Sequence, residues 1–180
     1  MIKLIGGAPR VGKTLLAERV AQDSRASWIS TDVLTTVIRV GVPDLTRIDW
    51  GNVDTITAHT ERFFPYLERF IWGVTSLRAP YVIEGVDFLP AQAAQLAQRF
   101  GVRSVFLGDS EMTAARLQAN LGRQPWLAGA SPERFQEMAD HVVAHTTLVK
   151  RECARLGLRF VDMAGDFEQR LREAAALLAS

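Results

Sequence analysis

Cysteine is nearly absent from this chain of 180 residues, since Cys153 is the only one. A single thiol cannot close an internal disulfide or build a cysteine metal cluster, so the disulfide-stapled secreted domains are excluded. We expect a protein of the reducing cytoplasm. Long apolar runs are also missing, because none approaches the roughly 18 to 20 residues that cross a bilayer. The opening segment MIKLIGGAPR is soon interrupted by glycines and an arginine, which argues against a signal peptide.

An excess of charge of one sign is lacking as well. The 21 lysines and arginines stand against 20 acidic residues, which gives a formal net charge of +1. This balance disfavours generic nucleic-acid binding through a basic surface. Hydrophobic residues make up 48% of the chain, enough to build a core, and the length suits one domain over residues 1–180. We expect a monomer or homodimer with no nucleic-acid or membrane partner.

Short apolar runs alternate with amphipathic segments along the chain. The runs predict strands at 2–5, 27–30, 81–83, 102–107 and 158–163. The 3.6-residue spacing predicts helices at 14–21 and 54–76, and further helices are expected in the gaps between strands, at about 91–100, 110–121, 132–156 and 166–178. Residues 40–53 carry glycine, proline and several aspartates, which is typical of a connection. Strands that alternate with helices indicate an α/β class with a parallel sheet covered on both faces.

Residues 7–14, GAPRVGKT, fit the pattern G-x-x-x-x-G-K-[ST] at every defined position. A strand before it and a helix after it let loop amides and the helix N-terminus form an anion site. Gly7 and Gly12 allow close approach of phosphate, Lys13 supplies a point charge, and Thr14 is the expected Mg²⁺ ligand. A plain glycine turn would require neither Lys13 nor Thr14. The predicted ATP-binding residues are Gly7, Ala8, Pro9, Arg10, Val11, Gly12, Lys13, Thr14 and Leu15.

The order of motifs resembles the small P-loop kinases of the adenylate-kinase-like class over essentially the whole chain. GAPRVGKT follows the first strand, WISTD the second, VIEG the third, and an arginine-bearing helix the fourth. The pieces ISTDVL and VIEGVDFLP are most similar to 2-phosphoglycerate kinase, with chloramphenicol phosphotransferase and gluconate kinase as further relatives. The resemblance implies a doubly wound three-layer fold with a five-stranded parallel sheet in the order 2-3-1-4-5 and a small helical lid. It also implies transfer of the γ-phosphate of ATP, with Mg²⁺, to a hydroxyl of a small-molecule acceptor.

Two positions depart from the 2-phosphoglycerate kinase pattern. Thr35 stands where those relatives often carry an arginine, although Arg39 fits one turn later. Asp87 replaces their histidine after the letters EGV. Because a carboxylate repels a phosphate-bearing acceptor, this replacement favours an uncharged or cationic hydroxyl compound.

Two carboxylates, Asp32 and Glu84, stand at the carboxyl ends of predicted strands, where open α/β sheets bind ligands. By position and by resemblance, Asp32 is the general base or orients the acceptor, and Glu84 holds Mg²⁺ through water. Either residue could instead cap a helix. Which of the two is the base stays open.

The predicted helix at 110–121 carries arginines that suit phosphate. Arg116, Asn120 and Arg123 are spaced i, i+4 and i+7, so they share a face if the helix runs that far. The resemblance implies a lid at about residues 116–131, in which Arg116 and Arg123 stabilise charge on the transferring phosphate. The alternative is a solvated helix face. The resemblance places the acceptor-binding region at about residues 33–70.

Two other functions remain open from the sequence. One is a nucleoside or nucleotide kinase, and the other is a non-catalytic regulatory module that binds ATP and transfers nothing. Asp32 and the arginines favour the kinase, because a switch needs no acceptor base. His141 and His145 have a spacing compatible with zinc ligands, but His145 lies on an apolar stripe, so both are expected to be packed in the core. His59 and Cys153 are expected to be core residues as well.

Overall fold

The computed structural model describes residues 1–43, 45, 52, 54–121 and 127–179. Its elements, in chain order, are β1 (Ile2–Gly7), α1 (Lys13–Ser24), β2 (Ser27–Ser30), α2 (Thr31–Gly41), α3 (Asp54–Ser76), β3 (Tyr81–Glu84), α4 (Pro90–Phe100), β4 (Arg103–Gly108), α5 (Ala114–Ala119), α6 (Pro132–Leu156), β5 (Arg159–Asp162) and α7 (Phe167–Ala179). None of these helices is both long and apolar enough to cross a membrane.

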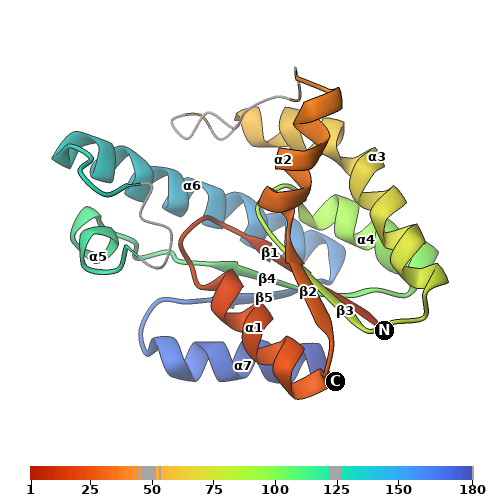
Figure 1. Cartoon of the computed structure of the whole chain (residues 1–180). Helices are drawn as coiled ribbons and strands as arrows, with labels where there is room; N and C mark the ends of the chain where they lie inside the picture. Colours follow the sequence, from red (N-terminus) through yellow and green to blue (C-terminus); the bar gives the residue numbers. More distant parts are fainter. Residues whose placement is uncertain (44, 46–51, 53, 122–126, 180) are drawn as a thin grey trace.

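The five strands form one parallel sheet in the order β2-β3-β1-β4-β5, which confirms the predicted class and strand order. Helices α1 and α7 lie on one face, and α3, α4 and α6 cover the other (Figure 1). The result is three layers, as the alternation of strands and helices requires. The helix predicted from Asp54 to about Ser76 is confirmed as α3, because the apolar period there is long.

Helix α2 was not predicted, because its residues have low helix propensity. The segment TDVLTTVIRVG is rich in β-branched residues, whose restricted rotamers lower helix propensity. Tertiary packing overrides that preference: Thr31 and Thr35, one turn apart, are both buried against the body of the protein. Ser30 caps the helix, since its side chain accepts a hydrogen bond from the backbone N–H of Asp32 at 3.3 Å.

The helix predicted at 110–121 is shorter than expected. Helix α5 begins only at Ala114, where the side chain of Thr113 accepts a hydrogen bond from the Arg116 N–H, and it ends at Ala119. The carboxylate of Asp109 is occupied in the preceding turn, where it accepts a hydrogen bond from the Glu111 N–H at 3.0 Å. The chain therefore leaves β4 through a turn before helix α5 starts.

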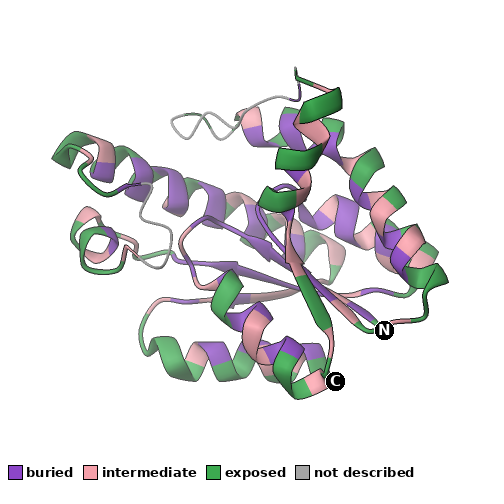
Figure 2. Ribbon diagram, viewed as in Figure 1, coloured by how far each residue is buried: buried purple, intermediate pink, exposed green. Residues whose placement is uncertain are grey.

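The core lies on both faces of the sheet, because neighbouring residues of a strand point in opposite directions. In β1, Ile5 packs into the apolar cluster that contains residues of α1 and α7, while Leu4 packs into the cluster that contains residues of α3 and α4. Figure 2 shows the central strands buried and the outer helix surfaces exposed. Continuous apolar strands such as these are typical of a sheet covered on both sides.

The end of β1 approaches β4 too closely for any side chain. A Cβ added to Gly7 would lie 1.9 Å from the Leu107 carbonyl oxygen, and Gly7 has a φ of 121°. The chain then turns, with the Ala8 N–H donating to the same Leu107 oxygen at 3.0 Å. Gly7 is therefore required by the strand packing as well as by any ligand.

The histidines of α6 are packed in the core, as the apolar stripe predicted. His141 and His145 are both nearly fully buried, and their rings meet edge to face. Cys153 on the same helix is also buried. Burial lowers the pKa of His145 from 6.5 to about 3, with smaller contributions from the charges of Lys13 and His141. His145 is thus neutral in the folded protein at ordinary pH.

This buried histidine predicts a loss of stability in acid. Its pKa is lower in the folded chain than in the unfolded chain, so the unfolded state binds more protons between pH 6.5 and about 3. Above pH 6.5 the histidine is neutral in both states and costs the folded protein no stability. As the pH falls below 6.5, the free energy of unfolding decreases by up to about 1.4 kcal/mol per pH unit. Urea unfolding at pH 7, 5 and 4 should show a shallower loss for His145→Leu than for the wild type; parallel losses in the two proteins would contradict the assignment.

Candidate functional site

The loop after β1 closes around the ammonium group of Lys13. Its Nζ donates to the Ala8 carbonyl oxygen at 2.6 Å, and the side chain is 7% exposed. Burial lowers the pKa of Lys13, an effect opposed by the negative charges of Glu84, Asp32 and Asp87. A positive charge thus lies at the N-terminus of α1, where helix amides already favour anions. This arrangement fits the phosphate-binding loop that the sequence predicts.

The first turn of α1 contacts the end of β3. The Thr14 hydroxyl donates to Glu84 Oε1 at 3.2 Å, and Glu84 is buried. Burial raises the pKa of Glu84, whereas Lys13 and hydrogen bonds from Ser30 and Thr14 oppose the rise. A hydroxyl and a carboxylate oxygen are the hard ligands that Mg²⁺ takes in proteins. The donor set of Thr14 and Glu84 therefore fits the metal predicted from the sequence.

Asp32 lies on the first turn of α2, with its side chain accessible to solvent. The protein around it raises the pKa of its carboxyl, chiefly through burial of the site and then through the negative charge of Asp87. The positive charges of Lys13, Arg39 and His59 act in the opposite direction. An accessible carboxylate with a raised pKa, near the lysine of the glycine-rich loop, has the properties that the predicted general base requires.

The structure thus brings together residues that the sequence predicted separately. Lys13, Asp32 and Glu84 come from α1, α2 and β3, and their charges act on one another. Strand pairing explains the meeting, since Ser30 of β2 is the register partner of Glu84 of β3. Parallel strands place their carboxyl ends at the same edge of the sheet.

A buried pair beside Asp32 was missed by the sequence interpretation. His59 Nε2 of α3 lies 2.6 Å from Asp87 Oδ1, and the other oxygen of Asp87 accepts a hydrogen bond from the Thr31 hydroxyl. All three side chains are buried. His59 was predicted to be a packed core histidine, and its burial is confirmed, but its partner was not foreseen. The only available signal was a histidine on an otherwise apolar helix face.

Helix α5 ends at Ala119, so it does not run far enough for the shared face that the spacing of Arg116, Asn120 and Arg123 allowed. Asn120 lies at the C-cap of α5 with non-helical backbone, so it does not continue a face with Arg116, and Arg123 lies outside the described residues. Arg116 is instead bound to Asp109 by two contacts, at 2.9 and 3.2 Å, and donates to the Glu111 carbonyl oxygen at 3.1 Å.

The α5 segment does contact the phosphate-binding loop, by another route. Arg10, which has a φ of 64°, donates through Nη2 to the Asn120 carbonyl oxygen at 2.8 Å. This contact joins the loop to the end of α5 across more than a hundred residues of sequence. Residues 122–126 of the predicted lid at 116–131 lie outside the described residues, as do residues 44, 46–51 and 53 of the predicted acceptor-binding region at 33–70.

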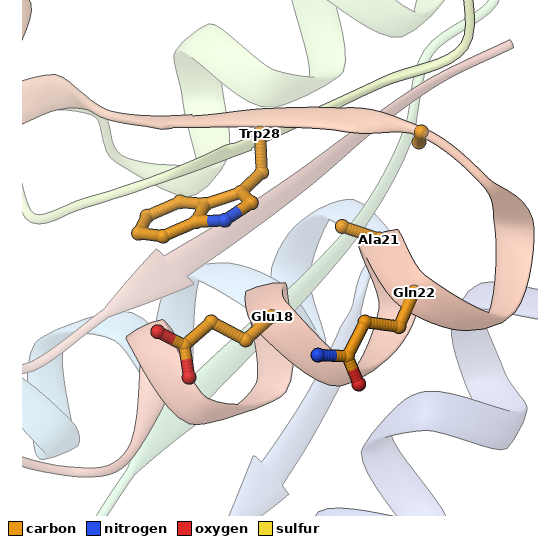
Figure 3. Close-up of a pocket in the computed structure, with 5 residues that line it drawn as sticks. Glu18, Ala21, Gln22 and Trp28 are labelled. Carbon is orange, nitrogen blue, oxygen red and sulfur yellow. The ribbon is translucent and has the colours of Figure 1, made fainter.

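A separate hollow lies away from these residues. It is bordered by α1 and β2, has a volume of about 370 Å³, and is lined by Glu18, Ala21, Gln22, Ala26 and Trp28. Figure 3 shows the Trp28 indole facing the side of α1 that carries Glu18. No residue of the phosphate-binding loop, nor Asp32 or Glu84, lines this hollow, so it does not belong to the candidate site.

Solved structures share this fold. A shikimate kinase from Bacteroides thetaiotaomicron matches with a TM-score of 0.59 at 16% identity, covering 100% of this chain and 99% of that one. A gluconokinase from Sinorhizobium meliloti matches with a TM-score of 0.53 at 17% identity, covering 99% and 90%. A shikimate kinase from Acinetobacter baumannii, solved in complex with shikimate, matches with a TM-score of 0.54 at 12% identity, covering 99% and 90%.

No family model and no curated protein sequence matches the chain. At these low identities the solved structures establish the fold alone. The fold is that of the small P-loop kinases, as the order of motifs predicted.

Gly85 provides a stability test of how α2 is attached to the sheet. A Cβ at Gly85 would lie 1.7 Å from the Thr31 hydroxyl oxygen, so Gly85→Ala must displace the start of α2. We expect a loss of about 1 to 3 kcal/mol in the free energy of unfolding. Gly73, inside α3, has nothing within 4 Å of an added Cβ, so Gly73→Ala should stabilise by about 0.5 to 1 kcal/mol. Urea unfolding measures both, and equal effects of the two changes would contradict the packing argument.

Proposed function

We propose that this protein is an ATP- and Mg²⁺-dependent kinase that transfers the γ-phosphate of ATP to a hydroxyl of a small-molecule acceptor. The observation that carries the proposal is the meeting of Lys13, Asp32 and Glu84 at one edge of the sheet, beside the phosphate-binding loop. The likeness to gluconokinase and shikimate kinase structures supports a small-molecule acceptor. We place the activity in the cytoplasm, on the single buried cysteine.

In this proposal the loop of residues 7–14 holds the ATP phosphates through its amides and the N-terminus of α1. In the structure, the Lys13 ammonium donates to the Ala8 carbonyl of the same loop. When ATP binds, this ammonium turns to the β- and γ-phosphates. Thr14 and Glu84 hold Mg²⁺, which supplies neutralising charge to the phosphate oxygens when bound. These residues position the reactants and neutralise charge on the phosphates, because phosphoryl transfer demands little covalent chemistry from a protein.

Asp32 receives the proton of the acceptor hydroxyl. The acceptor oxygen forms a bond to the γ-phosphorus, the bond from that phosphorus to the β–γ bridging oxygen breaks, and ADP leaves with the electron pair. The proton moves to the Asp32 carboxylate and then to solvent. A carboxyl pKa raised by its surroundings brings this base closer to the operating pH, which makes it more effective.

The acceptor class is wider than the sequence suggested. Asp87 was expected to repel a phosphate-bearing acceptor, but it is buried and each of its oxygens contacts another side chain. The negative charge of Asp87 raises the pKa of the Asp32 carboxyl, but the Asp87 side chain itself is not exposed to a ligand. Arg39, half-buried on α2, acts on the same carboxylate with positive charge. Neutral and acidic hydroxyl compounds therefore belong in the acceptor panel beside cationic ones.

Loss of Lys13 or Asp32 should abolish acceptor-dependent turnover. We expect Lys13→Ala to weaken ATP binding and Asp32→Asn to keep ATP binding while lowering kcat about 100-fold or more. ADP release is measured with ATP and Mg²⁺ across sugars, sugar acids, phosphoglycerates, nucleosides, nucleotides and aminoglycoside or phenicol antibiotics. Asp23→Asn, an exposed carboxylate on α1, is the matched control and should retain full activity.

The same panel separates the alternative functions. Turnover confined to nucleosides or nucleotides would favour a nucleoside or nucleotide kinase. Tight ATP binding with no acceptor-dependent ADP release from any compound would contradict the kinase and favour a regulatory module.

The Mg²⁺ requirement should depend on Thr14 and Glu84. Removing the hydroxyl, by Thr14→Val, or the negative charge, by Glu84→Gln, should raise the Mg²⁺ concentration for half-maximal activity by about tenfold, with part of the rate restored at high Mg²⁺. Thr147→Val is the matched control, because that exposed hydroxyl only donates to the Val143 carbonyl of its own helix. An unchanged Mg²⁺ dependence in both site variants would exclude these residues as ligands.

A further inference from the structure

A buried polar chain joins α3 to the first residue of α2. It runs from His59 Nε2 to Asp87 Oδ1 at 2.6 Å, and from Asp87 Oδ2 to the Thr31 hydroxyl. Their exposed fractions are 1% for His59, 4% for Asp87 and 0% for Thr31. Thr31 is the neighbour of Asp32 in the sequence, so the chain ends one residue from the proposed base.

This chain is an unusual way to attach a helix. His59 lies in an apolar environment, stacked on Phe63 with ring centroids 6.1 Å apart, and Phe63 is fully buried. Burying a carboxylate and an imidazole costs desolvation free energy that apolar side chains of similar volume would not. Simple packing would hold α2 to the sheet without that cost. What directional contacts add is a fixed orientation.

The orientation that they fix is the rotation of α2 about its own axis. Successive residues of a helix point about 100° apart, so any rotation at Thr31 carries Asp32 with it. The Thr31 hydroxyl donates to Asp87 and also lies against Gly85, where an added Cβ would be 1.7 Å from the hydroxyl oxygen. Thr35, one turn later on the same side of the helix, is also buried. Asp32 and Val33 are the exposed residues of that turn, and of the two only Asp32 carries a carboxylate.

We propose that His59 and Asp87 are positioning residues that act through Thr31 to hold Asp32 at the acceptor hydroxyl. The inference rests on the proposed function of Asp32 as the base. It assigns no direct contact with the acceptor to His59, Asp87 or Thr31. A displacement of about 1 Å in a reacting group can cost up to about 100-fold in rate, so a pair behind the base is able to control turnover.

Two substitutions at Thr31 provide the sharpest test. Thr31→Val removes the hydroxyl and keeps the branched shape, whereas Thr31→Ser keeps the hydroxyl. We expect Thr31→Val to lower kcat by about tenfold or more with KM for ATP within about twofold of the wild type, and Thr31→Ser to stay within about threefold in kcat. Equal kcat values for the valine and serine variants would overturn the inference.

A double variant tests whether the residues act as one chain. His59→Phe keeps an aromatic ring beside Phe63 and removes the contact with Asp87. If both changes act through Asp87, His59→Phe combined with Thr31→Val should lower kcat no further than the more damaging single change. Cys153→Ala, a buried change in α6 away from the chain, controls for general destabilisation. A kcat loss as large in that control, at matched thermal stability, would overturn the inference.

Amide hydrogen exchange tests, without any acceptor, whether the contact of Thr31 with Asp87 holds α2 in place. In Thr31→Val, the Thr35 and Thr36 amides of α2 should exchange faster than in the wild type, while amides of α6 stay unchanged. Because this measurement needs no turnover, failure to find an acceptor would overturn the proposed function and leave exchange to decide the linkage. Unchanged exchange throughout α2 would overturn the linkage itself.

Discussion

The parallel pairing of β2, β3 and β1 is the constraint on which the site depends. Glu84 is the register partner of both Ser30 and Ile5, so the ends of three strands lie side by side. That register places the last residue of β2, the last of β3 and the start of the phosphate-binding loop at one edge. A shift of one residue would turn every side chain of a strand to the opposite face. The backbone hydrogen bonds of the sheet therefore bring together the strand ends from which the candidate site is built.

The charges at this edge are mutually dependent because most of them are buried. Burial by itself disfavours the charged form of Lys13 and of Glu84, and each is favoured by the opposite charge of the other. Asp87 is held by His59 and Thr31 in a similar way. A phosphate that enters the loop would meet a lysine whose only hydrogen-bond acceptor in the described structure is the Ala8 carbonyl. Little interaction must be broken before the ammonium can turn to an anion.

Local patterns predicted the parts of the fold that depend on local rules. The period of apolar residues located α3 from Asp54 to Ser76, and the glycine pattern located the phosphate-binding loop. Helix α2 escaped because β-branched residues are weak helix formers, and its stability comes from the burial of Thr31 and Thr35. The start of α5 was set too early, because Asp109 has the features of a helix cap but binds Arg116 instead. Competition among possible partners is decided in three dimensions and leaves no periodic signal.

The sequence by itself determined the fold class, because the alternation of short apolar runs and amphipathic segments is displayed directly by a linear chain. The strand order followed from resemblance. Lys13, Thr14, Asp32 and Glu84 were predicted as site residues from the glycine pattern, from their positions after predicted strands and from the resemblance, and they stay predictions. Only the tertiary structure decided what surrounds them. His59 and Asp87 are 28 residues apart, on a helix and a turn that the sheet brings together, and the sequence assigned them to unrelated roles, a packed histidine and a carboxylate near the acceptor. A hydrogen bond between distant residues depends on the path of the whole backbone, so no local pattern contains it.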